Sequence, residues 1–297
     1  MGWEGPGAGP QVQGKRIRPL LTLLTCSAAG GDWRAALPAA AAVELLHNFS
    51  LIHDDIQDNS PLRRGRPTVW KMWGIPQAIN AGDSLYTLAY SAIQDLAETT
   101  DPATTLTAGN LLQQTCLALT RGQFLDIDFE NRSDVSLEEY WLMIDGKTAA
   151  LIGASTELGA LSAGAAPAKL QTYRKFGHDL GLAFQVTDDL LGIWGDEDET
   201  GKSASSDLSA GKKSLPIVYG LGRGGEFAGR WQNGRLDPKR AADLAGYLER
   251  EGARQFTRKN ADELTGIALG SLEALEPHGE AGVALFELTH LLLKRTA

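Results

Sequence analysis

Cysteine is scarce in this sequence of 297 residues, which contains only Cys26 and Cys116. The two thiols stand apart in apolar stretches without metal-binding spacing, so a disulfide scaffold is not expected. A run of 18 consecutive residues that are both apolar and uncharged is also missing, and no charged segment followed by an apolar stretch opens the chain. These absences argue against a membrane span and a signal peptide, and we expect a cytoplasmic protein with two buried free thiols.

Positive charge is in short supply as well, with 28 Lys and Arg against 37 Asp and Glu and a net charge of −9. Recognition of a phosphate backbone needs a basic face, so no nucleic-acid partner is expected. Sustained alternation of polar and apolar residues is absent, and so are hairpin signals. The sequence therefore predicts an all-α protein in which long helices surround a cavity within a single domain over residues 1–297.

Helical patterns alternate along the chain with short polar or proline-containing links. Residues 1–14 are rich in Gly and Pro and are predicted to be loop, and a first helix follows within 15–30. Asp32 can cap a second helix that ends near Asp58. The remaining predictions are helices at about 76–98, 102–122, 137–163 and 168–195, a polar flap at 196–213, and about four further helices that end near Arg295.

Two aspartate-rich clusters interrupt the apolar pattern, HDDIQD at 53–58 and TDDLLGIWGD at 187–196. On a helix, Asp54 and Asp58 lie on one face, about 6 Å apart along the axis. Acidic residues at a helix end are often merely solvated, but carboxylates this close repel each other unless a cation joins them. Mg²⁺ suits them, because it binds one or two carboxylates together with waters and substrate phosphates.

Basic residues accompany both clusters in the adjacent loops. Arg63 and Arg64 follow the first cluster and can clamp phosphate oxygens in bidentate fashion. The other members of this pattern are Lys15, Arg16 and Arg18 before the first helix, and Lys202 and Lys212 after the second acidic pair, Asp188 and Asp189. Acidic pairs and basic loops thus alternate twice, which indicates a site for two diphosphates and several metal ions.

Six motifs occur in one order over nearly the whole chain. They are GKRxRP at 14–19, DDxxD with RRGxPT at 54–68, GQxxD at 122–126, KT at 147–148, FQxxDD at 184–189 and GKxxxxDLxxGKxxLP at 201–216. Any one of them is weak, but six together are specific. The chain resembles the trans-prenyltransferase family, the polyprenyl diphosphate synthases that make farnesyl, geranylgeranyl and longer chains.

The resemblance implies a role for each matching residue. The diphosphate of isopentenyl diphosphate would be bound by Lys15, Arg18, His47 and Arg64. The allylic diphosphate would be held by Arg63, Lys147, Lys202 and Lys212. The Mg²⁺ ligands, for about three ions, would be Asp54, Asp58 and Asp188. The oxygens that flank the developing cation would belong to Thr148 and Gln185, although Gln185 alone could be a structural hydrogen bonder and His47 alone an ordinary helix histidine.

The implied reaction depends on charge. Metal ions and basic side chains stabilise the departing diphosphate, so the allylic carbon–oxygen bond ionises in a pocket kept dry by apolar helices. The double bond of isopentenyl diphosphate then attacks the cation head to tail, and a proton is lost to the released diphosphate. The carboxylates are metal ligands in this scheme and not acid or base. A homodimer is the habit of the family.

The sequence departs from the family pattern in two places. Gly192 stands where the second cluster usually has its last aspartate, and this loss is expected to weaken metal binding without abolishing it. Asp196 lies two turns beyond Asp188 and about 80° around a continuing helix, from where it could help through water. Only fourteen residues precede Lys15, so we expect either that the usual N-terminal helix of the family is missing or that the sequence is a truncated reading, and either would expose core surface or weaken a dimer.

Product length is expected to depend on the residues before the first cluster. An aromatic residue five positions before Asp54, here Phe49, with a small one at Ser50, resembles synthases that make about twenty carbons. Helical arithmetic places Ser50 about 40° from Asp54 but Phe49 about 140° away, so Phe49 could equally be a core residue. Two other functions stay open, a class I terpene cyclase, against which GKRIRP and His47 count, and a noncatalytic partner subunit of a synthase.

Overall fold

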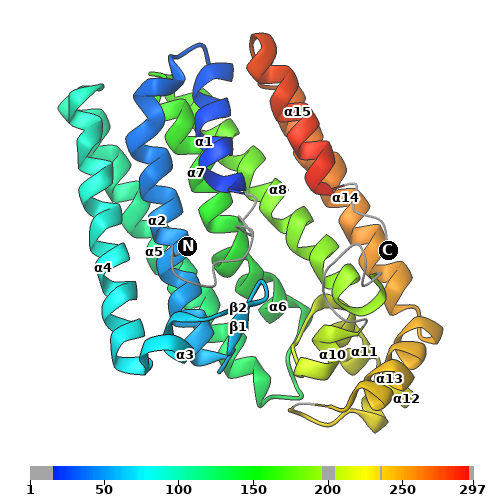
Figure 1. Ribbon diagram of the computed structural model, residues 1–297. Helices are drawn as coiled ribbons and strands as arrows, with labels where there is room; N and C mark the ends of the chain where they lie inside the picture. The colour runs from blue at the N-terminus through cyan, green and yellow to red at the C-terminus, as the bar shows by residue number, and fades with distance from the viewer. Residues whose placement is uncertain (1–15, 196–204, 235, 294–297) are drawn as a thin grey trace.

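The computed structural model describes residues 16–195, 205–234 and 236–293 (Figure 1). Most of this part of the chain is helical, as the sequence predicted. The first half contains α1 (Ile17–Ala28), η1 (Trp33–Ala36), α2 (Leu37–Gln57), β1 (Leu62–Arg63), β2 (Arg66–Pro67), α3 (Val69–Trp73), α4 (Ile75–Gln94), η2 (Asp95–Glu98), α5 (Pro102–Glu130) and α6 (Leu137–Ile144). The second half contains η3 (Asp145–Ala149), α7 (Ala150–Ser162), α8 (Pro167–Trp194), α10 (Ser206–Ala210), α11 (Leu215–Arg223), α12 (Glu226–Arg230), α13 (Pro238–Arg250), α14 (Ala253–Glu273) and α15 (Gly279–Leu293).

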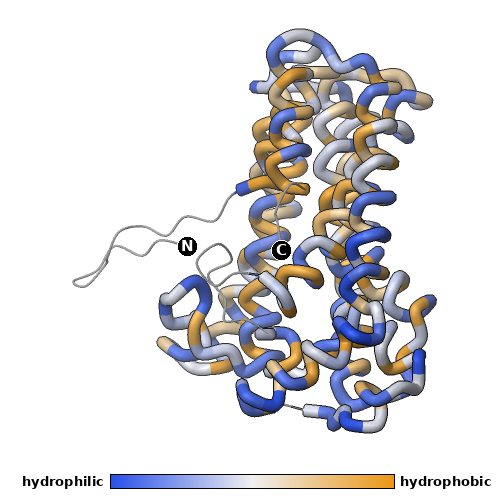
Figure 2. The backbone as a smooth tube through the Cα atoms, turned by 90° about the vertical axis from the view of Figure 1, so that its right-hand side faces the viewer, coloured by the Kyte–Doolittle hydropathy of each residue, from blue (hydrophilic) through white to orange (hydrophobic). Residues whose placement is uncertain are grey.

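The long helices stand side by side in a bundle. Helix α2 packs against α4, α7 packs against α1 and α8, and α14 packs along α8 (Figure 1). One apolar cluster joins α2, α4, α5 and α7, and a second joins α1, α7, α8, α14 and α15. Apolar residues recur along these helices while the connecting loops are mostly hydrophilic (Figure 2). The acidic ends of α2 and α8 lie toward the same end of the bundle, beside β1, β2 and α10 (Figure 1).

The second helix of the chain is the most apolar of the long ones. Asp32 accepts a hydrogen bond from the backbone of Arg34, but it caps the 3₁₀ turn η1 that precedes α2 and not α2 itself, whose N-cap residue is Ala36. The segment Trp33–Gln57 is long and apolar enough to cross a membrane by length and composition. Its Val43 and Leu46 side chains are nevertheless fully buried in the bundle. Packing within the protein therefore accounts for its apolar residues.

A small hairpin follows α2, so the prediction that hairpins are absent was wrong. Strands β1 and β2 pair antiparallel around a two-residue turn formed by Arg64 and Gly65. Both turn residues have positive φ, 53° and 75°, as a type I′ turn requires. Because arginine rarely takes this conformation, the usual Asn-Gly or Asp-Gly signature is missing. The basic segment after the first cluster, expected to be a loop, is thus a hairpin, with Arg63 in β1 and Arg64 in the turn.

Two helices differ in detail from their predicted extent. Helix α5 continues beyond 122 to Glu130, so the GQxxD motif lies on a helix. The predicted helix at 137–163 begins at the capping box of Ser136 and Glu139 and contains a π-helical turn, η3. Such a turn often marks a functional site because it redirects side chains within a continuous helix. Here it carries Lys147 and Thr148.

Candidate active site

Three aspartates lie at the end of α2. Asp55 is buried, whereas Asp54 and Asp58 are partly accessible. Arg63 donates from Nε to Asp55 Oδ1 at 2.8 Å and from Nη2 to Asp54 Oδ2 at 3.1 Å. Gln123 on α5 donates to the other oxygen of Asp54 at 2.9 Å. Burial, and then the charge of Asp54, raises the pKa of Asp58 to about 6. The Asp54–Asp58 face therefore carries concentrated negative charge that a cation would relieve.

Two lysines face this charge from other elements. The Lys147 ammonium group on η3 contacts Asp126 on α5 and lies 3.7 Å from Asp54 Oδ1. Lys212 lies just before α11. Burial alone would lower the pKa of Lys212, but the charges of Asp126 and Asp207 outweigh burial, and the pKa is raised. Both cations are held among aspartates from separate segments. The structure thus brings Lys147 and Lys212 to the first cluster.

Close helix crossings place the π-helical turn between α5 and α8. A Cβ atom on Gly122 would lie 2.1 Å from the Lys147 backbone nitrogen, and one on Gly181 would lie 2.6 Å from the Ala149 Cα. Only glycine permits this approach at either crossing. The Thr148 hydroxyl consequently reaches α8 and donates to Gln185 Oε1 at 2.7 Å. Thr148 and Gln185 therefore form a hydrogen-bonded pair that joins η3 to α8.

The two aspartates of α8 have different surroundings. Asp189 is buried and accepts hydrogen bonds from the Tyr140 hydroxyl at 2.6 Å, the Leu215 backbone at 2.8 Å and Gln185 Nε2 at 2.8 Å. Burial, and then the charge of Asp207, raises the pKa of Asp189 to about 7. Asp188 is partly exposed. Asp189 therefore joins α6, α8 and α11, which leaves Asp188 as the metal-ligand candidate of this pair.

A second basic region lies where α1 meets α2. Arg18 Nη1 donates to His47 Nε2 at 3.2 Å, so His47 is a neutral imidazole with its proton on Nδ1. Burial, and then the charges of Arg18 and Arg64, lowers the pKa of His47. Burial also lowers the pKa of Arg18 to about 10, against the opposing charge of Glu44. The Nε atom of Arg18 is buried without a hydrogen-bond partner, and an anion would supply one.

Of the two residues expected to control product length, Phe49 lies on the side of α2 that faces α4. Phe49 is partly buried against the core, with its ring centroid 4.9 Å from that of His53 and 5.3 Å from that of Tyr86. Ser50 donates its hydroxyl to the His47 carbonyl at 2.8 Å. Phe49 thus belongs to an aromatic group between the two helices, and it is also a core residue.

Some predicted residues cannot be placed, and others were missed. Lys15, Lys202 and Asp196 lie outside the described residues. Sequence reasoning gave no role to Gln123, Asp126 or Tyr140, which contact Asp54, Lys147 and Asp189 respectively. The first two fall within the GQxxD motif, which was therefore an available signal. No pattern in the sequence identifies Tyr140.

The carboxylates fit Mg²⁺ although they form no ready-made cage. Within the ranges that the structure describes, no group of three or more His, Cys, Asp or Glu side chains is arranged to hold a metal. Mg²⁺ does not need such a group, because it retains waters and uses substrate phosphates as ligands. Asp54 and Asp58, whose repulsion contributes to the raised pKa of Asp58, would form one part of the site. Asp188 would form the other.

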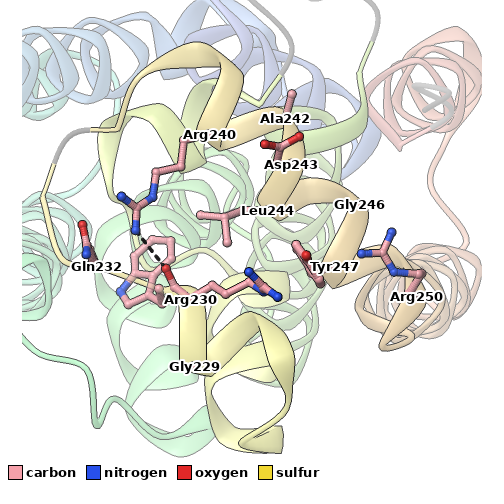
Figure 3. A pocket seen from close by; sticks show the side chains of 11 residues that line it. Gly229, Arg230, Gln232, Arg240, Ala242, Asp243, Leu244, Gly246, Tyr247 and Arg250 are labelled. Atoms are coloured by element: carbon pink, nitrogen blue, oxygen red, sulfur yellow. Dashed lines mark hydrogen bonds between the residues drawn. The ribbon is translucent and has the colours of Figure 1, made fainter.

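Two hollows lie elsewhere on the molecule. One, between α12 and α13, is lined by Arg230, Arg240, Tyr247 and Arg250 (Figure 3). Within it Arg240 donates to the backbone carbonyl of Arg230 at 3.2 Å. The other is an apolar groove formed by α6, α8 and α14. Neither contains the aspartates of α2, so both are separate from the candidate site.

Comparison with known proteins identifies the family to which this chain is similar. The family model described as "Polyprenyl synthetase" matches residues 9–232. A (2E,6E)-farnesyl diphosphate synthase of Mycobacterium tuberculosis is 38% identical over all of this chain and 84% of its own length. A geranylgeranyl diphosphate synthase of the same organism is 40% identical over 95% of this chain and 80% of its own. The crystal structure of a polyprenyl synthetase from Streptomyces coelicolor A3(2) superposes with a TM-score of 0.85 at 36% identity, covering 97% of this chain and 86% of that one.

Fold and site together define an all-α isoprenoid synthase with paired acidic and basic regions. The chain belongs to the polyprenyl synthetase family and is a polyprenyl diphosphate synthase, a trans-prenyltransferase.

Proposed function

We propose that this chain catalyses the Mg²⁺-dependent head-to-tail condensation of isopentenyl diphosphate with an allylic diphosphate, acting as a cytoplasmic homodimer. The observation that carries the proposal is the presence of two cationic regions on different elements around one acidic face. Arg18, with an unpaired buried Nε, lies in the first region. Lys147 and Lys212 lie in the second, beside the aspartates. Two regions fit two diphosphates, and a terpene cyclase needs only one.

The side chains have separate tasks in this proposal. Arg18 and His47 hold isopentenyl diphosphate, while Lys147 and Lys212 neutralise the allylic diphosphate as it departs. Bound Mg²⁺, held by the aspartates of α2 and α8, supplies further positive charge to the same diphosphate oxygens. Because Thr148 donates its proton to Gln185, its oxygen lone pairs are left to stabilise the nearby positive charge. The apolar helices exclude water.

The test is incubation of purified protein with isopentenyl diphosphate, Mg²⁺ and dimethylallyl, geranyl or farnesyl diphosphate, with products analysed by mass spectrometry. We expect elongation that disappears when Mg²⁺ is chelated. Asp54→Asn should lose most of the activity, whereas the exposed Asp243→Asn on α13 serves as a matched control that should retain it. Absence of elongation with every primer would refute the proposal, and a cyclic hydrocarbon product would favour the cyclase.

The proposed product has about twenty carbons, and Phe49 supports this length. Relatives named for farnesyl and for geranylgeranyl products are similarly close to this chain, so their names do not decide between the two. If the Phe49 ring, packed beside Tyr86, closes the product cavity, Phe49→Ala should give longer products and Phe49→Leu a smaller shift. Product distributions measured by mass spectrometry check this. Unchanged chain length in Phe49→Ala would remove Phe49 from the cavity floor.

An exposed apolar stripe on α5 supports the homodimer. Leu106, Leu117 and Phe124 are 67%, 72% and 67% exposed. Their spacings of 11 and 7 residues put them within about 20° of one another around the helix. A stripe of this kind suits the interface with a second copy. Leu117→Glu should therefore shift the mass in solution from that of a dimer to that of a monomer. The control Leu291→Glu, equally exposed on α15, should leave the mass unchanged. A dimer that persists in Leu117→Glu would contradict this assignment.

A further inference from the structure

The hollow between α12 and α13 concentrates positive charge on a molecule that is acidic overall. Its volume of about 640 Å³ falls within the range of small-molecule sites. The charged side chains of its lining are three arginines and one aspartate, namely Arg230, Arg240, Arg250 and Asp243. The whole chain, in contrast, has a net charge of −9. Figure 3 shows Asp243 apart from the guanidinium groups of Arg230 and Arg250, so the positive charge there is not neutralised from within.

Two of the arginines are held at a single aromatic ring. The guanidinium carbon of Arg230 lies 4.6 Å from the centroid of the Tyr247 ring, and that of Arg250 lies 4.4 Å from it. The ring stands between the two groups (Figure 3). Stacking on a ring orients a guanidinium group and leaves the N–H donors at its edge available to a ligand. Two cations held this close also repel each other, and a bound anion would offset that repulsion.

The protein itself supplies few anionic partners to these arginines. Arg230 Nη2 lies 3.9 Å from Glu226 Oε2, one turn earlier on α12, and both side chains are more than half exposed. An ion pair of this kind contributes little. No carboxylate in the described part of the chain lies within 4.0 Å of the charged nitrogens of Arg240 or Arg250. An anion from solution would therefore displace no strong interaction.

The floor of the hollow is fixed by contacts within the protein. Arg240 Nη2 donates to the carbonyl of Arg230 at 3.2 Å, which joins the start of α13 to the end of α12. Trp231, which also lines the hollow, is only 9% exposed and packs with its ring centroid 5.5 Å from that of Phe227. Its Nε1 atom donates to Asn233 Oδ1 at 2.9 Å. A site held in this way needs little ordering when a ligand binds.

We infer that the hollow between α12 and α13 is a further anion site, separate from the active site, that binds a phosphate group through Arg230, Arg240 and Arg250. Guanidinium groups match phosphate oxygens in bidentate fashion, and three of them suit the double charge and several oxygens of a phosphate better than a single carboxylate. A soluble phosphate compound and a phospholipid headgroup offer this same chemistry. The inference does not depend on the proposed function.

The test compares the wild type with the double variant Arg230→Gln and Arg250→Gln by isothermal titration calorimetry with inorganic phosphate, without Mg²⁺. Phosphate bound by the cations of the active site is common to both proteins, so the difference belongs to the hollow. The affinity of the hollow should fall by about 10-fold or more, because charge-assisted contacts are removed. The control Lys239→Gln removes an exposed charge of α13 outside the hollow and should bind phosphate like the wild type.

A single conservative variant separates a built site from diffuse attraction by positive charge. Arg250→Lys keeps the charge but loses the planar group that stacks on Tyr247 and binds phosphate oxygens in pairs. Phosphate binding should therefore weaken in Arg250→Lys as well. Wild-type affinity in this variant would show that only net charge matters, and the inference would fail. Circular dichroism confirms that each variant is folded, as expected because Arg230 and Arg250 are exposed.

Cosedimentation with vesicles of phosphatidylcholine and phosphatidylglycerol distinguishes the two sources of the phosphate group. Sedimentation of the wild type but not of the double variant would assign a lipid headgroup. Phosphate binding without sedimentation would assign a soluble compound. Identical phosphate titrations for the wild type and the double variant, or an equal loss in Lys239→Gln, would overturn the inference. Because no prenyl substrate is used, failure of the proposed function would leave these results unaffected.

Discussion

Replacement of Gly122 by alanine tests whether a single helix crossing holds the reactive side chains in place. The added Cβ atom would lie 2.1 Å from the backbone nitrogen and 2.8 Å from the Cα of Lys147, and 2.7 Å from the carbonyl carbon of Gly146. All three contacts are with backbone, so no side-chain rotation can relieve them. Helix α5 and the π-helical turn must therefore move apart by about 1 Å or more, given ordinary contacts of about 3.5 Å.

The magnitude follows from two opposing terms. Alanine in a helix interior is favoured over glycine by about 0.5–1 kcal/mol. Overpacking of a closely packed interior costs about 1–3 kcal/mol or more. Because contacts with backbone relax poorly, we expect the upper part of that range and a net loss of about 2 kcal/mol. A displacement of about 1 Å at Lys147 and Thr148 should also lower kcat/KM by about 100-fold.

Urea unfolding and steady-state elongation kinetics measure the two effects. Gly109→Ala is the matched control, since it lies on the same helix and its Cβ would meet nothing within 4 Å. The control should gain up to about 1 kcal/mol and keep its activity. If Gly122→Ala behaves like Gly109→Ala in both assays, the close approach of α5 to Lys147 does not position the site.

Two further predictions concern buried and partly buried polar contacts. Tyr140→Phe should lower the free energy of unfolding by about 1–3 kcal/mol, because buried Asp189 loses a hydrogen bond. Urea unfolding measures this loss, which should exceed that of the control Tyr219→Phe. Equal losses in the two variants would show that the bond from Tyr140 to Asp189 is not important for stability. The hydrogen bond to Asp145 raises the pKa of His178 to about 9, so His178 stabilises the fold fully below about pH 6.5 and loses this contribution as pH rises through about 9. The His178 side chain is one-third exposed, so solvent screening reduces this contribution to the free energy of unfolding to about 1 kcal/mol. Between pH 6.5 and 10 the free energy of unfolding of His178→Asn should therefore fall by about 1 kcal/mol less than that of the wild type.

The sequence predicted the fold well because the relevant signals are local. Leucine and alanine at helical spacing define the long helices that the structure contains, and the capping box of Ser136 and Glu139 marks the start of another helical segment. The site residues were predicted through motifs whose members lie on few elements. Asp54 lies in the last turn of α2 and Asp58 is its C-cap residue, while Lys147 and Thr148 are adjacent in sequence, so local structure alone brings the members of each pair close together.

The unpredicted features depend on contacts between distant segments or on rare backbone conformations. The hairpin turn places Arg64 at φ 53°, which arginine adopts only where the surroundings impose it. The π-helical turn depends on Gly122 and Gly181 on two neighbouring helices. The contact of Tyr140 with Asp189 joins residues 49 positions apart. Neither periodicity nor a short motif contains this information.

The two acidic clusters share one arrangement of their paired aspartates. In each, the second aspartate is buried at 4% exposure and is hydrogen bonded by another element, Asp55 by Arg63 and Asp189 by Tyr140. A buried carboxylate that is hydrogen bonded by a side chain of another element fixes its helix in position, and the residue before it lies one helical step, about 100°, around the axis. The pair DD thus combines an anchor with the aspartate that the proposed function makes a Mg²⁺ ligand. In the first cluster Asp58 follows that aspartate by four residues. In the second cluster the corresponding position is Gly192, so the two clusters share their buried anchor but differ in the carboxylate one turn further along.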